Sequence, residues 1–325
     1  MATRWMILSG WVLVLTGSAS AQPIDLAFLK TRAEATDFQE TTRYEEVMAF
    51  TEIVASGADK MYRTVFGYTS EGRALPLVVF GDVDGAGPEA VRASGKTRVF
   101  VQANIHAGEV CGKEAMLMLL RALAAGQHAA WTDSLVLLVA PIYNADGNER
   151  IALTNRPGQN GPLGGMGQRP NAQGFDLNRD HMKMDSPEAR SLVRLFNAYD
   201  PHVAVDLHTT NGARHAYHLT YSPPLHPNTP RAIDAFLRED WLPAVTRRIK
   251  DLYDWDFYYY GNVPRRTSNA ERGWYTFDHR PRFNNNYTGL RNRFAILSEA
   301  YAYATFEERV LATFYFVEEI LEFAY

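Results

Sequence analysis

Apolar residues recur with two different spacings along the chain, and the two spacings alternate from one end to the other. Short, mostly apolar runs are typical of buried strands, whereas apolar residues at steps of three and four predict helices. We expect strands at residues 75–80, 98–103, 135–140, 202–207 and 294–297. We expect helices at residues 44–53, 110–124, 185–199 and 306–323. This alternation predicts a layered α/β domain.

Two segments lack any apolar periodicity. Residues 154–176 are rich in glycine and proline, and residues 261–287 are rich in arginine, asparagine and proline. Long irregular loops inside a compact domain usually carry function. Neither an internal repeat nor a linker of domain-boundary composition divides the chain, so we expect a single domain.

The first 21 residues have the pattern of a secretory signal peptide. Arg4 precedes an apolar run at residues 5–16, and the small residues Ala-Ser-Ala at 19–21 form a cleavage site. We expect cleavage after Ala21 and export to the periplasm or the medium. No later stretch is apolar enough to span a bilayer, so we expect no stable membrane insertion after cleavage. Residues 22–43 would then lead into the catalytic domain.

The composition narrows the range of partners. The chain has 325 residues, with 33 lysines and arginines against 37 aspartates and glutamates. This balance does not give the basic surface that binds nucleic acid, so we expect no nucleic-acid partner. Cys111 is the only cysteine, which excludes an internal disulfide and a cysteine-based metal site.

His106 and Glu109 come directly after the expected strand at 98–103. Open α/β sheets place their sites at the carboxyl ends of parallel strands, and a three-residue spacing in a turn brings both side chains to one side. Imidazole nitrogen and carboxylate oxygen both bind zinc, and a catalytic zinc takes three protein ligands. The pattern by itself also fits a capped helix start with an incidental histidine.

A third zinc ligand is expected at the end of another strand. His208 follows the strand expected at 202–207, and it is the residue we choose. His202 lies at the opposite end of that strand. His215 and His218 lie three residues apart further along the chain and stay open as alternatives.

Glu299 closes the apolar strand expected at 294–297. A glutamate in this position is costly to bury unless it has a partner or a role. A metal hydrolase needs a carboxylate that takes a proton from water and returns it to the leaving group, and Glu299 is the candidate. The alternative is a solvated glutamate at a strand end.

Asn178 and Arg179 are adjacent just after the glycine-rich segment, and Arg169 lies nine residues before Asn178. The planar fork of arginine matches a carboxylate, and asparagine adds a neutral donor and acceptor. The pair is therefore a candidate clamp for the terminal carboxylate of a peptide. A structural arginine that joins the loop to the sheet is the alternative.

Taken in order, these motifs closely resemble those of the zinc metallocarboxypeptidase family. They are H-x-x-E after one strand, Asn-Ala-Asp-Gly at 144–147 after the next, Asp-Leu-Asn-Arg at 176–179, a strand ending in histidine and a last strand ending in glutamate. The resemblance covers residues 44–325, the expected catalytic domain. It implies an α/β fold with a central mixed, largely parallel sheet and helices on both faces. It also implies one zinc ion per chain and hydrolysis of the C-terminal peptide bond.

The resemblance implies roles for four residues at the metal. His106, Glu109 and His208 would be the zinc ligands. Glu299 would be the general base that acts on water at the metal and later protonates the leaving amine.

The expected substrate contacts follow from the same resemblance. Asn178 and Arg179 would hold the free C-terminal carboxylate of a peptide substrate, and Arg169 would stabilise the oxyanion. The family has a mobile tyrosine upstream of the base, and both Tyr275 and Tyr287 qualify for this role.

The segment 280–293 departs from the family pattern because it carries several arginines near the expected specificity pocket. They are Arg280, Arg282, Arg291 and Arg293. We therefore expect that an acidic C-terminal residue, or an anionic acyl group, could be a substrate.

One related activity shares most of these motifs. Zinc amidases that remove acyl groups from amino acids have a similar H-x-x-E, a D-L-N-R-like run and a strand-end histidine, so the ligand pattern alone admits them. The glutamate that ends the last strand, together with export, favours the peptidase. A non-catalytic relative is disfavoured because each expected chemical position holds a competent residue.

Overall fold

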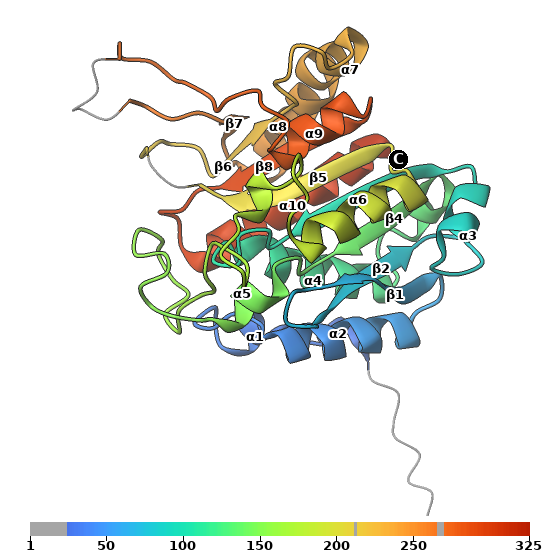
Figure 1. Cartoon of the computed structure of the whole chain (residues 1–325). Coiled ribbons are helices and arrows are strands. Elements are labelled where there is room, and N and C mark those ends of the chain that lie inside the picture. Colours follow the sequence, from blue (N-terminus) through green and yellow to red (C-terminus); the bar gives the residue numbers. More distant parts are fainter. Residues whose placement is uncertain (1–24, 211–212, 265–269) are drawn as a thin grey trace, which may run out of the picture.

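The computed structural model describes residues 25–210, 213–264 and 270–325, and a single central sheet runs through it (Figure 1). The sheet has eight strands in the order β1-β2-β4-β3-β5-β8-β6-β7. The strands are β1 (Met61–Tyr68), β2 (Ala74–Phe80), β3 (Thr97–Ala103), β4 (Leu135–Ala140), β5 (Val203–Thr209), β6 (Leu219–Ser222), β7 (Phe257–Tyr259) and β8 (Phe294–Ala300).

The four strands in the middle of the sheet, β4, β3, β5 and β8, run parallel to one another. On one side, β2 pairs antiparallel with β4 and β1 pairs antiparallel with β2. On the other side, β6 pairs antiparallel with β8, and β7 runs parallel to β6. The sheet is therefore mixed with a parallel centre, which confirms the expected fold class.

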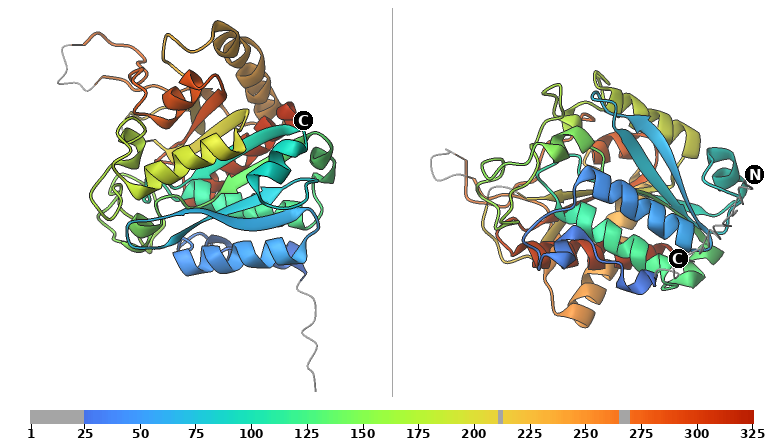
Figure 2. Two further views of the ribbon diagram at one scale, coloured as in Figure 1. Left: turned by 45° about the vertical axis from the view of Figure 1, so that its right-hand side comes forward. Right: turned by 90° about the horizontal axis from the view of Figure 1, so that it is seen from below.

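Helices cover both faces of the sheet (Figures 1 and 2). On one face, α4 packs between α2 and α10, and α10 also packs against α8, whereas α6 packs on β1 and α9 on β5 and β8. The longer helices are α2 (Tyr44–Gly57), α4 (Cys111–Ala124), α6 (Pro187–Tyr199), α8 (Leu242–Tyr253), α9 (Asn284–Leu290) and α10 (Phe306–Ala324). The short ones are α1 (Arg32–Ala35), α3 (Pro88–Ala93), α5 (Ala145–Glu149) and α7 (Arg231–Ala235).

The apolar runs predicted the central strands well, because these strands are buried on both faces. The run at 135–140 coincides with β4, and β5 and β8 each continue to the polar residues that follow the apolar run. The helices expected at 110–124 and 306–323 match α4 and α10 within one residue at each end. The outer strands β6 and β7 and the largely polar helix α8 were not predicted, because they have no long apolar run.

The signal peptide expected at residues 1–21 lies outside the described residues. Within the described residues, no helix has both the length and the apolar character needed to span a membrane.

The segment before α2 packs onto the body of the domain. The side chains of Thr41 and Thr42 donate hydrogen bonds to the buried carboxylate of Glu114 in α4, at 2.8 and 2.6 Å. The Lys113 ammonium donates to Asn148 at 2.6 Å and is fully buried. These buried polar contacts join the lead-in to α4 and to α5, so residues 31–43 belong to the same core as the sheet.

The carboxyl ends of β3, β5 and β8 meet at one edge of the sheet. In the parallel pairing of β5 with β8, His208 lies opposite Glu299, so both side chains project from the same face of the sheet. Glycine at position 112 lets α4 approach this edge, because a Cβ there would lie 2.7 Å from the Cβ of Leu207. The fold thus brings the chemically active residues together at one end of the parallel strands.

Candidate metal centre

Three side chains from two segments about a hundred residues apart converge at this edge. One ligand atom from each of His106, Glu109 and His208 lies within 4.8 Å of the others. The Nδ1 atoms of the two histidines lie 3.0 and 2.8 Å from the two carboxylate oxygens of Glu109. All three side chains are buried, with at most 3% of each residue exposed.

The turn after β3 explains how His106 and Glu109 meet. Asn104 adopts a left-handed backbone conformation (φ +64°), which ends the strand, and the Glu109 N–H then donates to the His106 carbonyl at 2.9 Å. The Thr209 N–H donates to Glu109 Oε2 at 3.2 Å, which joins this turn to β5. Local turn geometry and strand pairing therefore both orient the Glu109 carboxylate.

Each histidine is backed by an aspartate on its far side. His106 Nε2 lies 3.1 Å from Asp176 Oδ1, and His208 Nε2 lies 2.9 Å from Asp206 Oδ2. A carboxylate at Nε2 favours the tautomer with the proton there and leaves Nδ1 as the basic nitrogen. Two neutral imidazoles and one carboxylate, each oriented in this way, are the donor set that suits a catalytic zinc. The residues therefore fit the metal.

The alternative histidines lie elsewhere. His215 packs among aromatic rings, 4.4 Å from the centroid of Tyr301 and 5.6 Å from that of Trp274. His218 stacks on Trp255 with ring centroids 4.9 Å apart. Neither belongs to the cluster that could hold a metal ion among the described residues.

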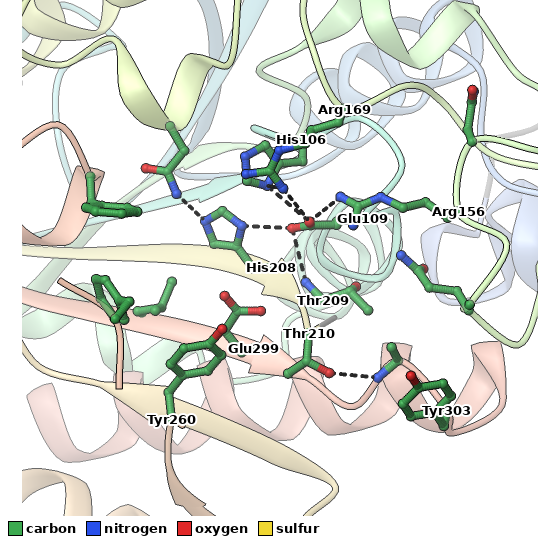
Figure 3. A pocket seen from close by; sticks show the side chains of 18 of the residues that line it. His106, Glu109, Arg156, Arg169, His208, Thr209, Thr210, Tyr260, Glu299 and Tyr303 are labelled. Atoms are coloured by element: carbon green, nitrogen blue, oxygen red, sulfur yellow. Dashed lines mark hydrogen bonds and ion pairs between the residues drawn. The ribbon is translucent and has the colours of Figure 1, made fainter. Parts of the chain in front are cut away.

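A cavity of about 550 Å³ opens over the three residues, and its wall includes Glu299 (Figure 3). Burial raises the pKa of Glu299 to about 8, with the charge of His208 opposing and that of Glu109 adding to the rise. A carboxyl group with a pKa near neutrality is suited both to accept and to return a proton.

Arg179 lies at one end of this cavity. Its guanidinium stacks on the ring of Phe283, 4.2 Å from the centroid, and its NH1 donates to the Asn178 carbonyl at 2.7 Å. Among the described residues, no carboxylate lies within ion-pair distance of Arg179. The Oδ1 of Asn178 accepts from the Asn284 N–H at 2.9 Å, and its Nδ2 lies 3.3 Å from His208 Nε2. Of the two, Arg179 is the side chain that offers hydrogen-bond donors to a ligand.

Two arginines lie close to the carboxylate of Glu109. Arg169 is held by Asp176, which its Nε and NH2 contact at 3.0 and 2.9 Å, and its NH1 lies 3.8 Å from Glu109 Oε1. Arg156 forms a direct ion pair with Glu109 and is almost fully buried. Sequence reasoning missed Arg156. The only signal in the sequence was its position in the glycine-rich segment, and that segment also contains Arg169.

The tyrosines require a correction. Tyr287 packs against His181 and Phe196, and its hydroxyl accepts from Arg291 at 3.0 Å, away from the cavity. Tyr275 is 48% exposed and lines a neighbouring hollow.

Two other tyrosines, Tyr260 and Tyr303, line the cavity. Burial raises the pKa of Tyr260, and the nearby charge of Glu299 adds to the rise, so this hydroxyl stays protonated. No sequence pattern pointed to Tyr260, because it follows β7 at the edge of the sheet.

The four arginines of segment 280–293 also require a correction, because none of them lines the cavity. Each interacts with a partner outside it. These partners are Asp278 for Arg280 and Arg282, Asn197 for Arg291, and Asp200 for Arg293. The expected basis for binding an acidic C-terminal residue is therefore absent from the described cavity wall.

The fold and the metal centre define a class of metallopeptidases, and comparisons with known proteins agree. Residues 47–232, more than half of the chain, match the family model described as zinc carboxypeptidase. The chain belongs to the zinc carboxypeptidase family.

A curated relative, carboxypeptidase 2 from Trichophyton rubrum, is 32% identical over 178 residues. The match covers 53% of this chain and 29% of that protein, so the chain spans less than a third of its relative's length. A metallo-carboxypeptidase from Burkholderia cenocepacia has a similar structure, with a TM-score of 0.62, 18% identity, and coverage of 86% of this chain and 68% of that one.

A second solved structure is the metallo-carboxypeptidase from Pseudomonas aeruginosa in complex with (2-guanidinoethylmercapto)succinic acid. It has a TM-score of 0.59 at 16% identity and covers 86% of this chain and 68% of that one. At these identities the two structures show the shared fold.

Proposed function

We propose that this chain is a zinc-dependent carboxypeptidase that releases single residues from the C-terminus of peptides. The observation that carries the proposal is the arrangement of one cavity. It contains a histidine–glutamate–histidine cluster, a carboxylate with a raised pKa beside that cluster, and an arginine, Arg179, that has no carboxylate within ion-pair distance among the described residues.

His106, Glu109 and His208 would hold the zinc ion. When bound, zinc lowers the pKa of water to about 7 and polarises a carbonyl group. Asp176 and Asp206 would each hold the Nε2 side of one histidine by a hydrogen bond, which orients Nδ1 toward the metal.

Glu299 is the proposed catalytic base. It lies opposite His208 in the strand pairing, so its carboxylate faces the same space as the metal ligands. Glu299 takes a proton from the attacking water and gives a proton to the leaving amine, which conserves the protonation state of the enzyme over one cycle.

Arg179 is the proposed anchor for the substrate carboxylate. An arginine that is half-buried and lacks an acidic partner gains a charge-assisted hydrogen bond when a carboxylate enters. This contact would limit the enzyme to chains with a free C-terminus and set the scissile bond at a fixed distance from the end.

Arg169 is the proposed stabiliser of the oxyanion. Asp176 fixes its guanidinium at the edge of the metal centre, where NH1 remains free of a short ion pair. A preorganised cation beside the developing charge lowers the barrier of the chemical step. Arg156, which pairs with Glu109, instead neutralises charge at the metal ligand.

The test is hydrolysis of a blocked dipeptide with a free carboxylate and of its C-terminal amide. The zinc-loaded protein should release the terminal amino acid from the free acid, and removal of zinc by a chelator should abolish this activity. Equal turnover of the amide would contradict the carboxypeptidase assignment. Cleavage of N-acyl amino acids without cleavage of peptides would favour the amidase instead.

We also propose that residues 1–21 direct export and are removed after Ala21. The charged, apolar and small-residue segments of this pattern support the proposal. Amino-terminal sequencing of the protein purified from its native host tests it. A mature chain that begins at residue 22 is expected, and a retained Met1 would refute export by this route.

A further inference from the structure

A buried arginine of the glycine-rich segment reaches one of the expected metal ligands. Arg156 forms an ion pair with Oε1 of Glu109, and the side chain of Arg156 is only 9% exposed (Figure 3). Among the described residues, Glu109 is the only carboxylate within ion-pair distance of Arg156. Exposed ion pairs contribute little to a protein, whereas a buried cation acts strongly on the charges near it. We therefore asked what Arg156 adds to Glu109.

Other groups already orient the Glu109 carboxylate. Its Oε2 accepts from the Thr209 N–H at 3.2 Å and lies 2.8 Å from Nδ1 of His208. Its Oε1 lies 3.0 Å from Nδ1 of His106. None of these contacts involves Arg156. The orientation of the carboxylate is therefore provided for, and what Arg156 adds is a positive charge.

The loop that carries Arg156 is fastened by contacts of its own. Asn155 donates from Nδ2 to the carbonyl of Met166 at 2.9 Å, which ties the two ends of the loop together. Arg309 of α10, which is 1% exposed, donates to the carbonyl of Asn160 at 3.0 Å. The fold thus holds the loop in place independently of the metal ligands, and it delivers Arg156 to Glu109.

The turn between the ligands leaves room for this arginine. A Cβ at position 108, which is glycine, would lie 2.8 Å from Cγ of Arg156 and 3.0 Å from its Nε, so a side chain there would displace Arg156. The Nε atom is buried and has no hydrogen-bond partner among the described residues. Burial of an unpaired N–H costs folding free energy, and such a cost often marks a functional position.

We propose that Arg156 is a positioning residue that acts through Glu109, lowering the affinity of the centre for zinc and raising its turnover. An ordinary hydrogen bond to a ligand strengthens metal binding. A cation beside the ligand does the opposite, because it takes up part of the carboxylate charge and repels a divalent ion. Zinc that is held in this way would keep more of its charge for polarising water and a carbonyl group. The inference rests on the proposed zinc peptidase and adds a residue that tunes it.

The main test compares Arg156→Gln, which removes the charge and keeps hydrogen-bonding groups, with the wild-type protein. Competition with a zinc-binding dye at constant pH gives the zinc affinity, and a blocked dipeptide gives kcat at full zinc occupancy. The variant should bind zinc at least about tenfold more tightly and turn over at least about tenfold more slowly. Damage to the fold would weaken both, so the opposite directions identify the proposed role. A zinc affinity that is unchanged or lower would overturn the inference.

The two levels of the proposal fail separately. If the wild-type protein binds zinc but releases no residue from the dipeptide, the carboxypeptidase function fails, and the affinities still decide whether Arg156 opposes the metal. If residues are released and the two affinities are equal, only the role of Arg156 fails.

A conservative variant and a matched control complete the set. Arg156→Lys keeps the charge without the planar fork, so both quantities should return to within about threefold of wild type. A lysine variant that behaves like Arg156→Gln would contradict the charge argument. Arg150→Gln removes an arginine that is 43% exposed and pairs with Glu71 at 2.5 Å. It should leave both quantities within about twofold, and the same changes as in Arg156→Gln would show that the contact with Glu109 is not their cause.

Thermal unfolding provides a readout that does not depend on activity. In the presence of a chelator, Arg156→Gln should have a lower Tm than the wild-type protein, because the buried charge of Glu109 has lost its closest cation. Zinc should then raise the Tm of the variant by more than it raises that of the wild type, since it binds the variant more tightly. An equal or smaller rise would contradict the inference.

Discussion

The two histidines of the metal centre are backed by aspartates in different surroundings. Asp206 lies within β5 beside His208, its side chain is 4% exposed, and its other oxygen accepts from the amide of Gln102 at 3.2 Å. Asp176 lies in the glycine-rich loop beside His106, its side chain is 26% exposed, and its other oxygen pairs with Arg169.

The difference divides the metal centre into two halves. His208 with Asp206 forms the rigid half, which the sheet holds, and His106 with Asp176 forms the adjustable half, which the loop holds. Gln102 and Asp206 are paired in the register of β3 and β5, so the whole sheet holds His208 in place. A neutral amide leaves the full charge of Asp206 acting on His208, whereas Arg169 neutralises part of the charge of Asp176. Burial alone would raise the pKa of Asp176, but His106 and Arg169 hold it below its usual value. We therefore expect the position of the His208 side chain to be more tightly held than that of His106.

The largest effect is expected for His208→Ala. This change removes a ligand from the rigid half, so zinc affinity should fall by more than about 100-fold, beyond the loss typical of an outer-shell partner. Zinc content after dialysis against a weak chelator, followed by mass spectrometry of the native protein, measures it. Full zinc occupancy in the variant would place the third ligand elsewhere.

Glu299→Gln should separate chemistry from metal binding. Turnover should fall by about 100- to 10,000-fold because proton transfer is lost. Zinc affinity should stay close to the wild-type value, because Glu299 is not in the ligand cluster. Comparison of steady-state rates at matched zinc occupancy provides the measurement. Retained activity would exclude Glu299 as the base.

Asp206→Asn tests the rigid half without removing a ligand. The loss of charge behind His208 should weaken zinc binding by about 10- to 100-fold. Competition with a zinc-binding dye at constant pH reports the affinity. An unchanged zinc affinity would mean that the charge of Asp206 does not act on the metal and that this side chain only stabilises the sheet.

Asp176→Asn should have a smaller effect on the metal than Asp206→Asn, below about tenfold in zinc affinity, because this aspartate is partly solvated and already paired. Its main effect should be on kcat, since Arg169 loses its tether beside the reacting carbonyl. The same dye competition and steady-state kinetics test both statements. A loss of zinc affinity as large as that of Asp206→Asn would erase the distinction between the two halves.

The elements with strong apolar periodicity could be predicted from the sequence. Strands β3, β4, β5 and β8 lie in the buried centre, where both faces need apolar residues, so a short apolar run identifies them. The outer strands β6 and β7 obtain their stability from pairing with neighbouring strands, which no local pattern records. The same applies to α8, whose few apolar positions are buried against α10 and β7.

For the candidate site, spacing within one segment selected His106 with Glu109 and Asn178 with Arg179. The directions of Tyr275 and Tyr287 were not predictable. Tyr275 lies in the irregular segment after β7 and Tyr287 on α9, and no local pattern records whether either side chain turns toward the cavity. Arg156 lies beside Glu109 because of the path that the glycine-rich loop takes, and the sequence does not record this path. In segment 280–293, Arg280 and Arg282 pair with the nearby Asp278. The partners of Arg291 and Arg293, which are Asn197 and Asp200, come from a distant part of the chain.

The order of motifs along the chain determined the family, the zinc ligands to expect and the general α/β architecture, because strand ends and short turns are encoded locally. Tertiary structure alone decided which arginine of the cavity has no close carboxylate among the described residues, and which tyrosines line the cavity. Each of these depends on side chains from three or more segments meeting in one space, and the distance between them in the sequence carries no information about that meeting.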